Sequence, residues 1–146
     1  MYVIDATVYA PLVIIYGKNL VKALKKVKPA ILDLTIYEVC NVFWKQHVKF
    51  HRISREEAKI ACKTSKNLAR YLTLYSIRDI DAEETIEIAV ENNITFYDAS
   101  YITLAKNLKT PIASEDKDIL NTAPKYNIKT IKLNQLINIL KQEKTP

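Results

Sequence analysis

Four carboxylates lie at the ends of segments whose composition is typical of β-strands. Asp5 ends the first such run, YVID, and Asp116 follows a later one, TPIA. Glu38 and Asp98 begin the helices expected after the second strand and before the fourth. Open α/β sheets gather ligands at the carboxyl ends of their strands. An ionised carboxylate buried there needs hydrogen bonds, a cation or a metal to replace its lost hydration.

Each of these acids also has a structural explanation. Asp5 could cap the first helix, and Glu38 completes a T-x-x-E capping box that starts at Thr35. Asp116 could be a first-turn acid after an N-cap Ser114, where the helix dipole favours it. Taken singly, Glu38 and Asp116 are better explained as helix-terminus residues, and for Asp5 the two explanations balance.

Asp98 is harder to explain as a cap. The helical count places it within the stripe formed by Tyr97, Tyr101, Ala105 and Leu108, which should pack inward. A carboxylate beside a buried stripe is a candidate functional group, and for Asp98 this explanation balances that of a helix cap.

Together the four acids predict a divalent cation site. Carboxylates that converge on one edge of a sheet raise each other's pKa unless a cation lies among them. Oxygen ligands with no Cys or His nearby favour Mg²⁺ or Mn²⁺ over zinc. The chemistry that follows is metal-assisted hydrolysis of a phosphodiester.

The charge balance agrees with a phosphate-bearing substrate. The chain has 22 Lys and Arg against 16 Asp and Glu, for a net charge of +6, and a pI near 9.2. The basic residues cluster at 18–28, along 45–70 and towards the C-terminus. Such an excess attracts polyanions and favours nucleic acid as the partner.

Short strands alternate with helices along the chain, which positions these acids. Strands are expected at 2–5, 30–34, 71–77, 110–113 and 130–133. Helices are expected at 10–16, 20–27, 35–51, 55–68, 82–92 and 98–108 and near the C-terminus. This alternation predicts a parallel sheet between two layers of helices. The 146 residues, 49% of them apolar, should form a single domain.

Several other functions are excluded or disfavoured. Gly17 is the single glycine of the chain, so no glycine-rich phosphate loop, dinucleotide turn or nucleophile elbow is present. The apolar stretch at 8–16 is too short to span a bilayer, and no basic residue precedes it, so we expect a cytoplasmic protein without a membrane segment.

The remaining metal-type and aromatic side chains are expected to be structural. Cys40 and Cys62 should be reduced thiols in the core. His47 and His51 share a helix face but lack a third ligand, so ordinary surface or half-buried roles are expected. Three tyrosines could stack on bases, although core packing is the expected role of each: Tyr71, Tyr75 and Tyr101.

Three segments resemble the PIN domain, in particular the ribonuclease toxins of VapBC toxin–antitoxin systems. YVIDATVY is similar to the opening strand of that family, and LTIYEVCNVFWK is similar to its second-acid helix. ITFYDASYITLAKNLKTPIASEDKDI is similar to the third-acid helix, the following strand and the T/S-x-D motif. The last block is the most specific, and the resemblance covers nearly the whole chain.

The resemblance implies a three-layer α/β/α sandwich whose five-stranded parallel sheet has the order 3-2-1-4-5. It implies an Mg²⁺-dependent or Mn²⁺-dependent endoribonuclease that acts on RNA, dimerises, and is silenced by an antitoxin that fills the active-site groove. The metal-binding acids would be Asp5, Glu38, Asp98 and Asp116, with Thr7 and Ser114 as supporting hydroxyls.

Asp118 is a competing last ligand, two residues after Asp116. Asp116 is preferred because it lies nearer the end of the strand, and Asp118 is the reserve. Ser114 replaces the Thr that is commoner in the family, which is a mild change.

Three other functions compete with the nuclease. A phosphatase with an aspartate nucleophile needs a second acid two residues after Asp5, where Thr7 stands. A receiver-like domain needs paired acids after the first strand, and Asp5 has no acidic neighbour. A basic α/β domain that binds nucleic acid or assists RNA processing without turnover is the non-enzymatic alternative.

Overall fold

A computed structural model describes residues 1–142. Its centre is one five-stranded sheet in which every neighbouring pair is parallel, with the order β3-β2-β1-β4-β5. The predicted fold class and strand order are confirmed. The strands are β1 (Tyr2–Ile4), β2 (Pro29–Leu32), β3 (Thr73–Tyr75), β4 (Ile112–Ala113) and β5 (Thr130–Ile131).

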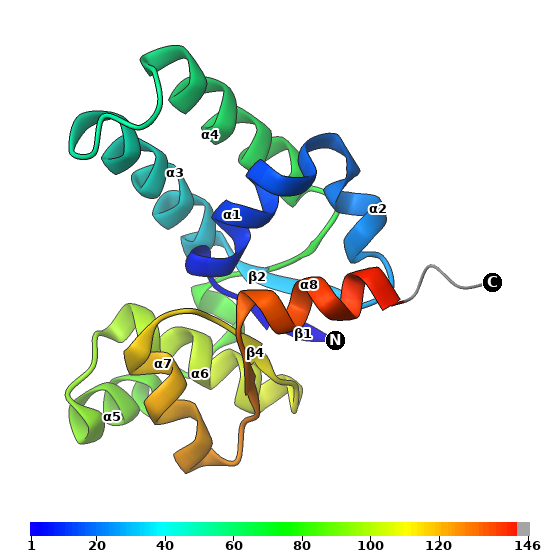
Figure 1. The fold of residues 1–146 in the computed structure, drawn as a ribbon. Helices are drawn as coiled ribbons and strands as arrows, with labels where there is room; N and C mark the ends of the chain where they lie inside the picture. The colour runs from blue at the N-terminus through cyan, green and yellow to red at the C-terminus, as the bar shows by residue number, and fades with distance from the viewer. Residues whose placement is uncertain (143–146) are drawn as a thin grey trace.

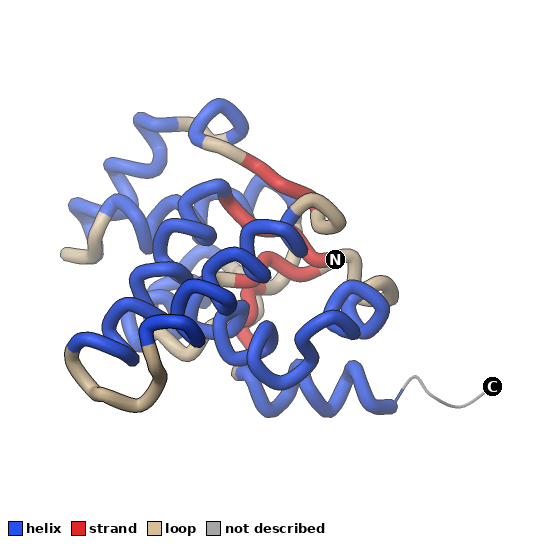
Figure 2. Tube along the Cα trace, turned by 90° about the horizontal axis from the view of Figure 1, so that it is seen from above, coloured by secondary structure: helices blue, strands red, loops and turns tan. Residues whose placement is uncertain are grey.

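Helices cover both faces of this sheet (Figure 1). One layer holds α1 (Ala6–Tyr16), α2 (Leu20–Leu24), α3 (Asp33–Val48), α4 (Arg55–Ala69) and α8 (Leu133–Gln142). The other holds α5 (Ala82–Asn92), α6 (Phe96–Leu108) and α7 (Lys117–Thr122). Short 3₁₀ turns lie at Gly17–Asn19, Ile77–Asp79 and Ala123–Tyr126. Seen from above, the strands lie between the helices (Figure 2).

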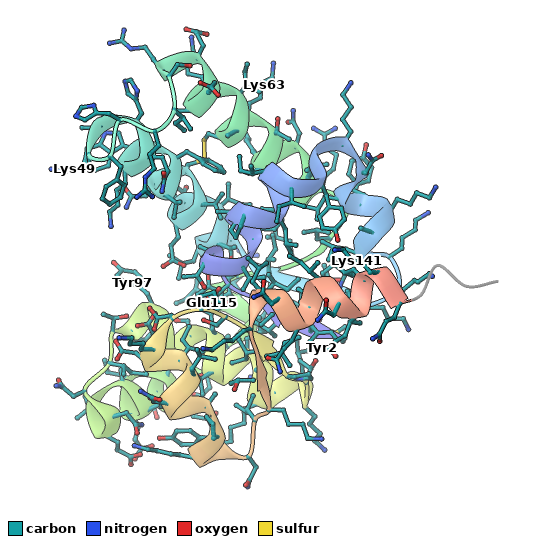
Figure 3. The ribbon with its side chains drawn as sticks, in the orientation of Figure 1. Tyr2, Lys49, Lys63, Tyr97, Glu115 and Lys141 are labelled. Carbon is teal, nitrogen blue, oxygen red and sulfur yellow. A yellow bond between two sulfur atoms is a disulfide. The ribbon has the colours of Figure 1, made fainter. Side chains whose placement is uncertain are left out.

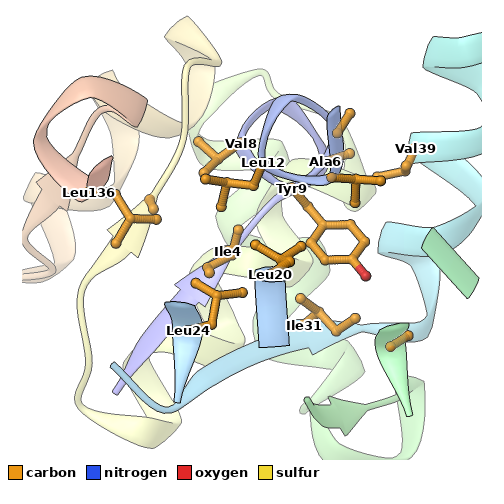
Figure 4. Packing of buried hydrophobic residues seen from close by; sticks show 14 of the residues in the cluster. Ile4, Ala6, Val8, Tyr9, Leu12, Leu20, Leu24, Ile31, Val39 and Leu136 are labelled. Carbon is orange, nitrogen blue, oxygen red and sulfur yellow. The ribbon is translucent and has the colours of Figure 1, made fainter. Parts of the chain in front are cut away.

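Successive strand residues point into opposite cores. Ile4 and Ile31 pack with α1, α2 and α8, whereas their neighbours Val3 and Ala30 pack with α5 and α6. This follows from the two-residue period of a strand. Figure 4 shows the first core, in which Tyr9 lies among Ile4, Leu20 and Ile31. Both faces are buried, so the central strands are apolar throughout, as in other parallel sheets.

The first helix starts earlier than predicted. The expected start was Ala10, but α1 begins at Ala6 because the Asp5 side chain caps it and accepts a hydrogen bond from the Val8 N–H. Pro11 therefore lies inside the helix instead of in its first turn. It removes the N–H that would bond the Thr7 carbonyl. Every strand is one to four residues shorter than predicted.

The prediction for the two cysteines is wrong. Cys40 of α3 and Cys62 of α4 form a disulfide, with Cα atoms 4.9 Å apart. The two helices pack side by side as a hairpin that extends beyond the sheet. Each cysteine lies on the face turned toward the other helix, and no local spacing in the sequence signals this long-range pairing. The hairpin is thus covalently fixed at mid-length.

The His47 ring plays the structural role that was expected. Its Nδ1 lies 2.9 Å from the Ile53 carbonyl oxygen and donates to it, which holds the loop between α3 and α4. Tyr71 does not meet its prediction, because 64% of its surface is exposed. Within residues 1–142, no helix is both long and apolar enough to cross a membrane.

Candidate active site

Asp5 joins three parts of the fold at the carboxyl end of β1. Its backbone N–H donates to the Ala113 carbonyl at the end of β4, and its side chain caps α1. The residue is 2% exposed. Both carboxylate oxygens accept hydroxyl hydrogen bonds, one from Thr7 at 2.6 Å and the other from Ser114. The Asp5 carboxylate is therefore held in a single orientation.

The same two hydroxyls tie Asp5 to the loop after β4. Thr7 Oγ1 accepts from the Glu115 N–H at 2.8 Å, and Ser114 Oγ accepts from the Asp116 N–H at 2.9 Å. Glu115 is fixed from the other side, because its carboxylate accepts from the Leu133 N–H at 2.8 Å. The loop is thereby anchored to α1 and to the start of α8.

Asp116 caps α7 with one carboxylate oxygen. Its Oδ1 accepts from the N–H groups of Asp118 and Ile119 at 2.9 and 3.2 Å. The alternative in which Ser114 is the cap is wrong, because the Ser114 hydroxyl serves Asp5 and the Asp116 backbone. Capping uses Oδ1, which leaves the second oxygen of Asp116 outside the capping bonds.

Asp98 lies in the first turn of α6, but it does not cap it. Thr95 is the N-cap, and its hydroxyl accepts from the Asp98 N–H at 3.1 Å. The predicted stripe is partly wrong: Tyr97 is 59% exposed, whereas Tyr101 and Ala105 are buried. Carboxylate oxygens of Asp98, Asp116 and Asp118 all lie within 4.8 Å of one another, close enough to share one cation.

Glu38 reaches the site from the second turn of α3. The predicted Thr35–Glu38 capping box is wrong, because α3 begins at Asp33 and the Thr35 hydroxyl accepts from the Leu32 N–H at 3.1 Å. The buried Tyr101 hydroxyl donates to Glu38 Oε1 at 2.6 Å. Since that hydroxyl has one proton, the Thr35 hydroxyl, 2.8 Å away, must donate to it. This chain of donors orients the Glu38 carboxylate.

The pKa values indicate that the charges of these acids act on one another. Burial raises the pKa of Asp5 to about 6, and the charge of Asp116 adds to the rise. Burial also raises the pKa of Asp98 to about 6, with Asp116, Asp118 and Glu38 each contributing repulsion. The pKa of Glu38 is raised by burial and by Asp116. Such clustered acids are stabilised when a cation lies among them.

The residues present fit a hard divalent cation. All five acids offer oxygen, the ligand that Mg²⁺ and Mn²⁺ take in proteins. Because their pKa values are raised, these carboxyl groups keep protons at low pH. At neutral pH a bound ion would take the place of those protons. Sequence reasoning missed Tyr101 and Thr35, which orient Glu38. A Thr at the third position of the helix and a Tyr three residues after Asp98 were the available signals.

The sequence model of the PIN domain family matches residues 2–125. This chain belongs to the PIN domain family. All five acids of the cluster lie within that match.

Within the PIN family, the chain is similar to VapC proteins. It is 33% identical over 120 residues to Exonuclease VapC9 of Pyrobaculum aerophilum, covering 82% of this chain and 83% of that protein. It is 26% identical over 93 residues to Ribonuclease VapC3 of the same organism, covering 64% and 70%. The crystal structure of PAE2754 from Pyrobaculum aerophilum superposes with a TM-score of 0.74 at 28% identity, covering 97% of this chain and 90% of that one.

Proposed function

We propose that this PIN domain is an endoribonuclease that hydrolyses RNA phosphodiester bonds with Mg²⁺ or Mn²⁺. The observation that carries the proposal is the convergence of five carboxylates at the carboxyl edge of the sheet: Asp98, Asp116 and Asp118 lie within 4.8 Å of one another, and the charge of Asp116 acts on both Asp5 and Glu38. Relatives named as nucleases support it. When bound, the cation neutralises phosphoryl charge and supplies an activated water for in-line attack.

The proposed ligands are Asp5, Glu38, Asp98 and Asp116. Asp118 joins them as the reserve, because it faces Asp98 and Asp116 but is exposed. Thr7 and Ser114 hold the Asp5 carboxylate, and Tyr101 holds that of Glu38. Ligands fixed in this way need little rearrangement on binding the ion, which lowers the cost of assembling the charged site.

The biological setting is also a proposal. We infer that the chain is the toxin of a toxin–antitoxin pair, acts in the cytoplasm as a homodimer, and is silenced by an antitoxin protein. The similarity to two VapC proteins supports this setting. We also propose that residues 1–146 form a single PIN-like domain, on the basis of one sheet with a core on each face. Residues 143–146 lie outside the described residues.

Cleavage of a labelled, unstructured RNA tests the activity. The wild-type protein should cleave with Mg²⁺ or Mn²⁺ and stop in EDTA. Asp98→Asn should reduce the rate at least a hundredfold, because it removes a charged ligand while keeping the side-chain shape. Asp81→Asn is the matched control: Asp81 caps α5 on the surface, and Asn caps equally well. A closed circular RNA should also be cut, which requires an endonuclease.

Two results would contradict the proposal. Cleavage that continues in EDTA, or that Asp98→Asn leaves unchanged, would show that the acidic cluster is not the active site. Salt-sensitive RNA binding without any cleavage would instead support the non-catalytic nucleic-acid-binding alternative.

A further inference from the structure

The α3–α4 hairpin carries an exposed face that the acidic cluster does not explain. Glu38, Lys45 and Lys49 are spaced by seven and four residues, so they form one row along the exposed side of α3. Tyr37, Trp44 and Val48 have the same spacing and form the adjoining row. We call these six residues the outer face of α3. It begins at a proposed metal ligand and leads away from the site.

The apolar row of this face is open to solvent. The exposed fractions are 79% for Tyr37, 47% for Trp44 and 42% for Val48, and Phe50 just beyond the helix is 53% exposed. Tyr37, Trp44 and Val48 share one face of the helix, and exposed apolar side chains gathered on one face are typical of an interaction site. At 1.5 Å per residue, the helix from Glu38 to Val48 is about 15 Å long.

The cations beside this row are available to a partner. Within residues 1–142, Lys45, Lys49 and Arg52 form no ion pair with an acid. Two of them instead lie over exposed rings: Lys49 is 5.7 Å from the centre of the Trp44 ring, and Arg52 is 5.0 Å from that of Phe50. Unpaired cations interleaved with exposed aromatic rings are the features that bind single-stranded nucleic acid.

Charge is distributed unequally over the molecule. Residues 43–70 carry eight basic and two acidic side chains, whereas residues 71–118 carry four basic and ten acidic ones. The first stretch runs from the middle of α3 to the end of α4, and the second includes α5 and α6 on the opposite side of the sheet. A polyanion is therefore attracted to the hairpin and repelled from α5, which gives its approach a direction.

We propose that the outer face of α3 binds the single-stranded part of the RNA substrate that leads into the acidic site. In this arrangement the Trp44 ring stacks on a base, and Lys45 and Lys49 contact phosphates. The inference rests on the proposed nuclease function and adds the single-stranded form of the bound RNA and the path that it takes to the site. Lys49 marks the far end of this path in Figure 3.

Binding in EDTA tests the path separately from cleavage. The probe is a fluorescein-labelled, unstructured RNA of 15 nucleotides, with affinity read from anisotropy over a range of salt concentrations. Trp44→Ala should weaken binding roughly tenfold, because one stacked base is lost. Trp44→Phe should restore most of the affinity, whereas Trp44→Leu, which is apolar but cannot stack, should resemble Trp44→Ala.

A pair of lysine variants tests the phosphate contacts. Lys45→Ala/Lys49→Ala should reduce the slope of log affinity against log salt by about 1.4, the value for two phosphates of a single strand. The matched control is Lys109→Ala/Lys129→Ala, which removes the same charge from a cavity of about 470 Å³ far from α3. It should leave the slope unchanged. Thermal unfolding of each variant establishes that it is folded.

Three outcomes would overturn the inference. Equal slopes for the two lysine pairs, or wild-type affinity for Trp44→Leu, would show that the face does not bind RNA. A dimer that becomes monomeric in the Trp44 variants with unchanged RNA affinity would show that the face is a contact between protein chains. If wild-type protein cleaves RNA and these variants cleave equally well, this inference fails alone; if wild-type protein neither cleaves nor binds RNA, the proposed function fails too.

Discussion

At the scale of single residues, the Tyr101 hydroxyl connects the core to the acidic site. The ring is buried, and its hydroxyl donates to Glu38 and accepts from Thr35. Burial and the neighbouring Glu38 raise the Tyr101 pKa well above its ordinary value, so the hydroxyl stays protonated and remains a donor. It is a positioning group, because it acts on the candidate ligand Glu38.

Removing this hydroxyl tests the positioning role. Tyr101→Phe should lower kcat roughly tenfold to a hundredfold with little change in KM, since a hydrogen bond to a charged group contributes about 1.5 to 3 kcal/mol. The substitution should also weaken Mn²⁺ binding, as measured by calorimetry. The acidic limb of the pH–rate profile should move to higher pH, because Glu38 loses a donor that favours its charged form and its pKa rises.

Tyr126→Phe is the matched control for this change. The Tyr126 hydroxyl bonds Asn92 and Glu91 on the far side of α6 from the α3 hairpin, so its loss should leave kcat and the pH profile unchanged. Equal effects of the two substitutions would indicate a general loss of stability and would exclude the positioning role.

The candidate acids were predictable from the sequence, but the hydroxyls that orient Glu38 were not. Asp5 and Asp98 were identifiable because each places a charge in an otherwise apolar pattern. Tyr101 satisfied the same pattern as an ordinary core residue, so nothing local indicated where its hydroxyl would point. Asp118 was ranked after Asp116 as the last metal ligand because it lies further from the end of the strand in the sequence. The short helix α7 nevertheless brings it beside Asp98 and Asp116.

At the scale of elements, the α3–α4 hairpin depends on its disulfide. The bond between Cys40 and Cys62 closes a loop of 22 residues. Loop-closure entropy for this length corresponds to about 3 kcal/mol of stabilisation. Reduction, or Cys62→Ser, should therefore lower the melting temperature by roughly 6 to 12 °C for a domain of this size. Differential scanning calorimetry with and without dithiothreitol measures this shift.

Single and double variants identify the cause of that loss. Dithiothreitol should have no further effect on Cys62→Ser or on Cys40→Ser/Cys62→Ser, because neither contains the bond. Thiol titration establishes that the reductant has released both thiols of the wild-type protein. If its melting temperature is then unchanged, helix packing alone fixes the hairpin.

The predictability of the elements depended on local signals. The helices expected from 55 and from 82 begin where predicted, because the residues that cap them, Ser54 and Asp81, lie directly before them in the sequence. The start of α1 was misplaced because Pro11 was assigned to the first turn. The antiparallel approach of Cys40 and Cys62 is a tertiary contact, which no local periodicity encodes.

At the scale of the whole molecule, the acidic site makes stability depend on pH. Raised pKa values in the folded state mean that folded Asp5 and Asp98 hold protons that the unfolded chain has released. The unfolding free energy should therefore fall as pH rises from about 4 through 6, and the loss is complete above both pKa values. For the buried Asp5 alone, the fall between pH 5 and 7.5 should be about 1 to 2 kcal/mol.

Urea unfolding in EDTA at pH 5 and at pH 7.5 measures this difference. Adding Mn²⁺ at pH 7.5 should recover the lost stability, because the ion binds the folded state. Asp5→Asn/Asp98→Asn should flatten the dependence on pH and abolish the response to Mn²⁺. A metal-free protein that grows more stable between these two pH values would contradict the origin assigned to the raised pKa values.

The layered architecture was predictable from the alternation of strands and helices, since parallel strands need crossover helices on both faces. The order of the strands came from the resemblance to the PIN domain, because alternation alone does not select among the possible orders. The lengths of β4 and β5, two residues each, were overestimated because composition alone does not show where the pairing with a neighbouring strand ends.

One consequence concerns laboratory evolution of this protein. Asp5 joins the first strand to the fourth, starts the first helix and faces the acidic centre, so a single position serves both folding and chemistry. A neutral amide there would retain the cap and relieve the repulsion. Selection for heat resistance alone should therefore favour Asn at this position. The selected proteins would be more thermostable but would no longer catalyse the reaction.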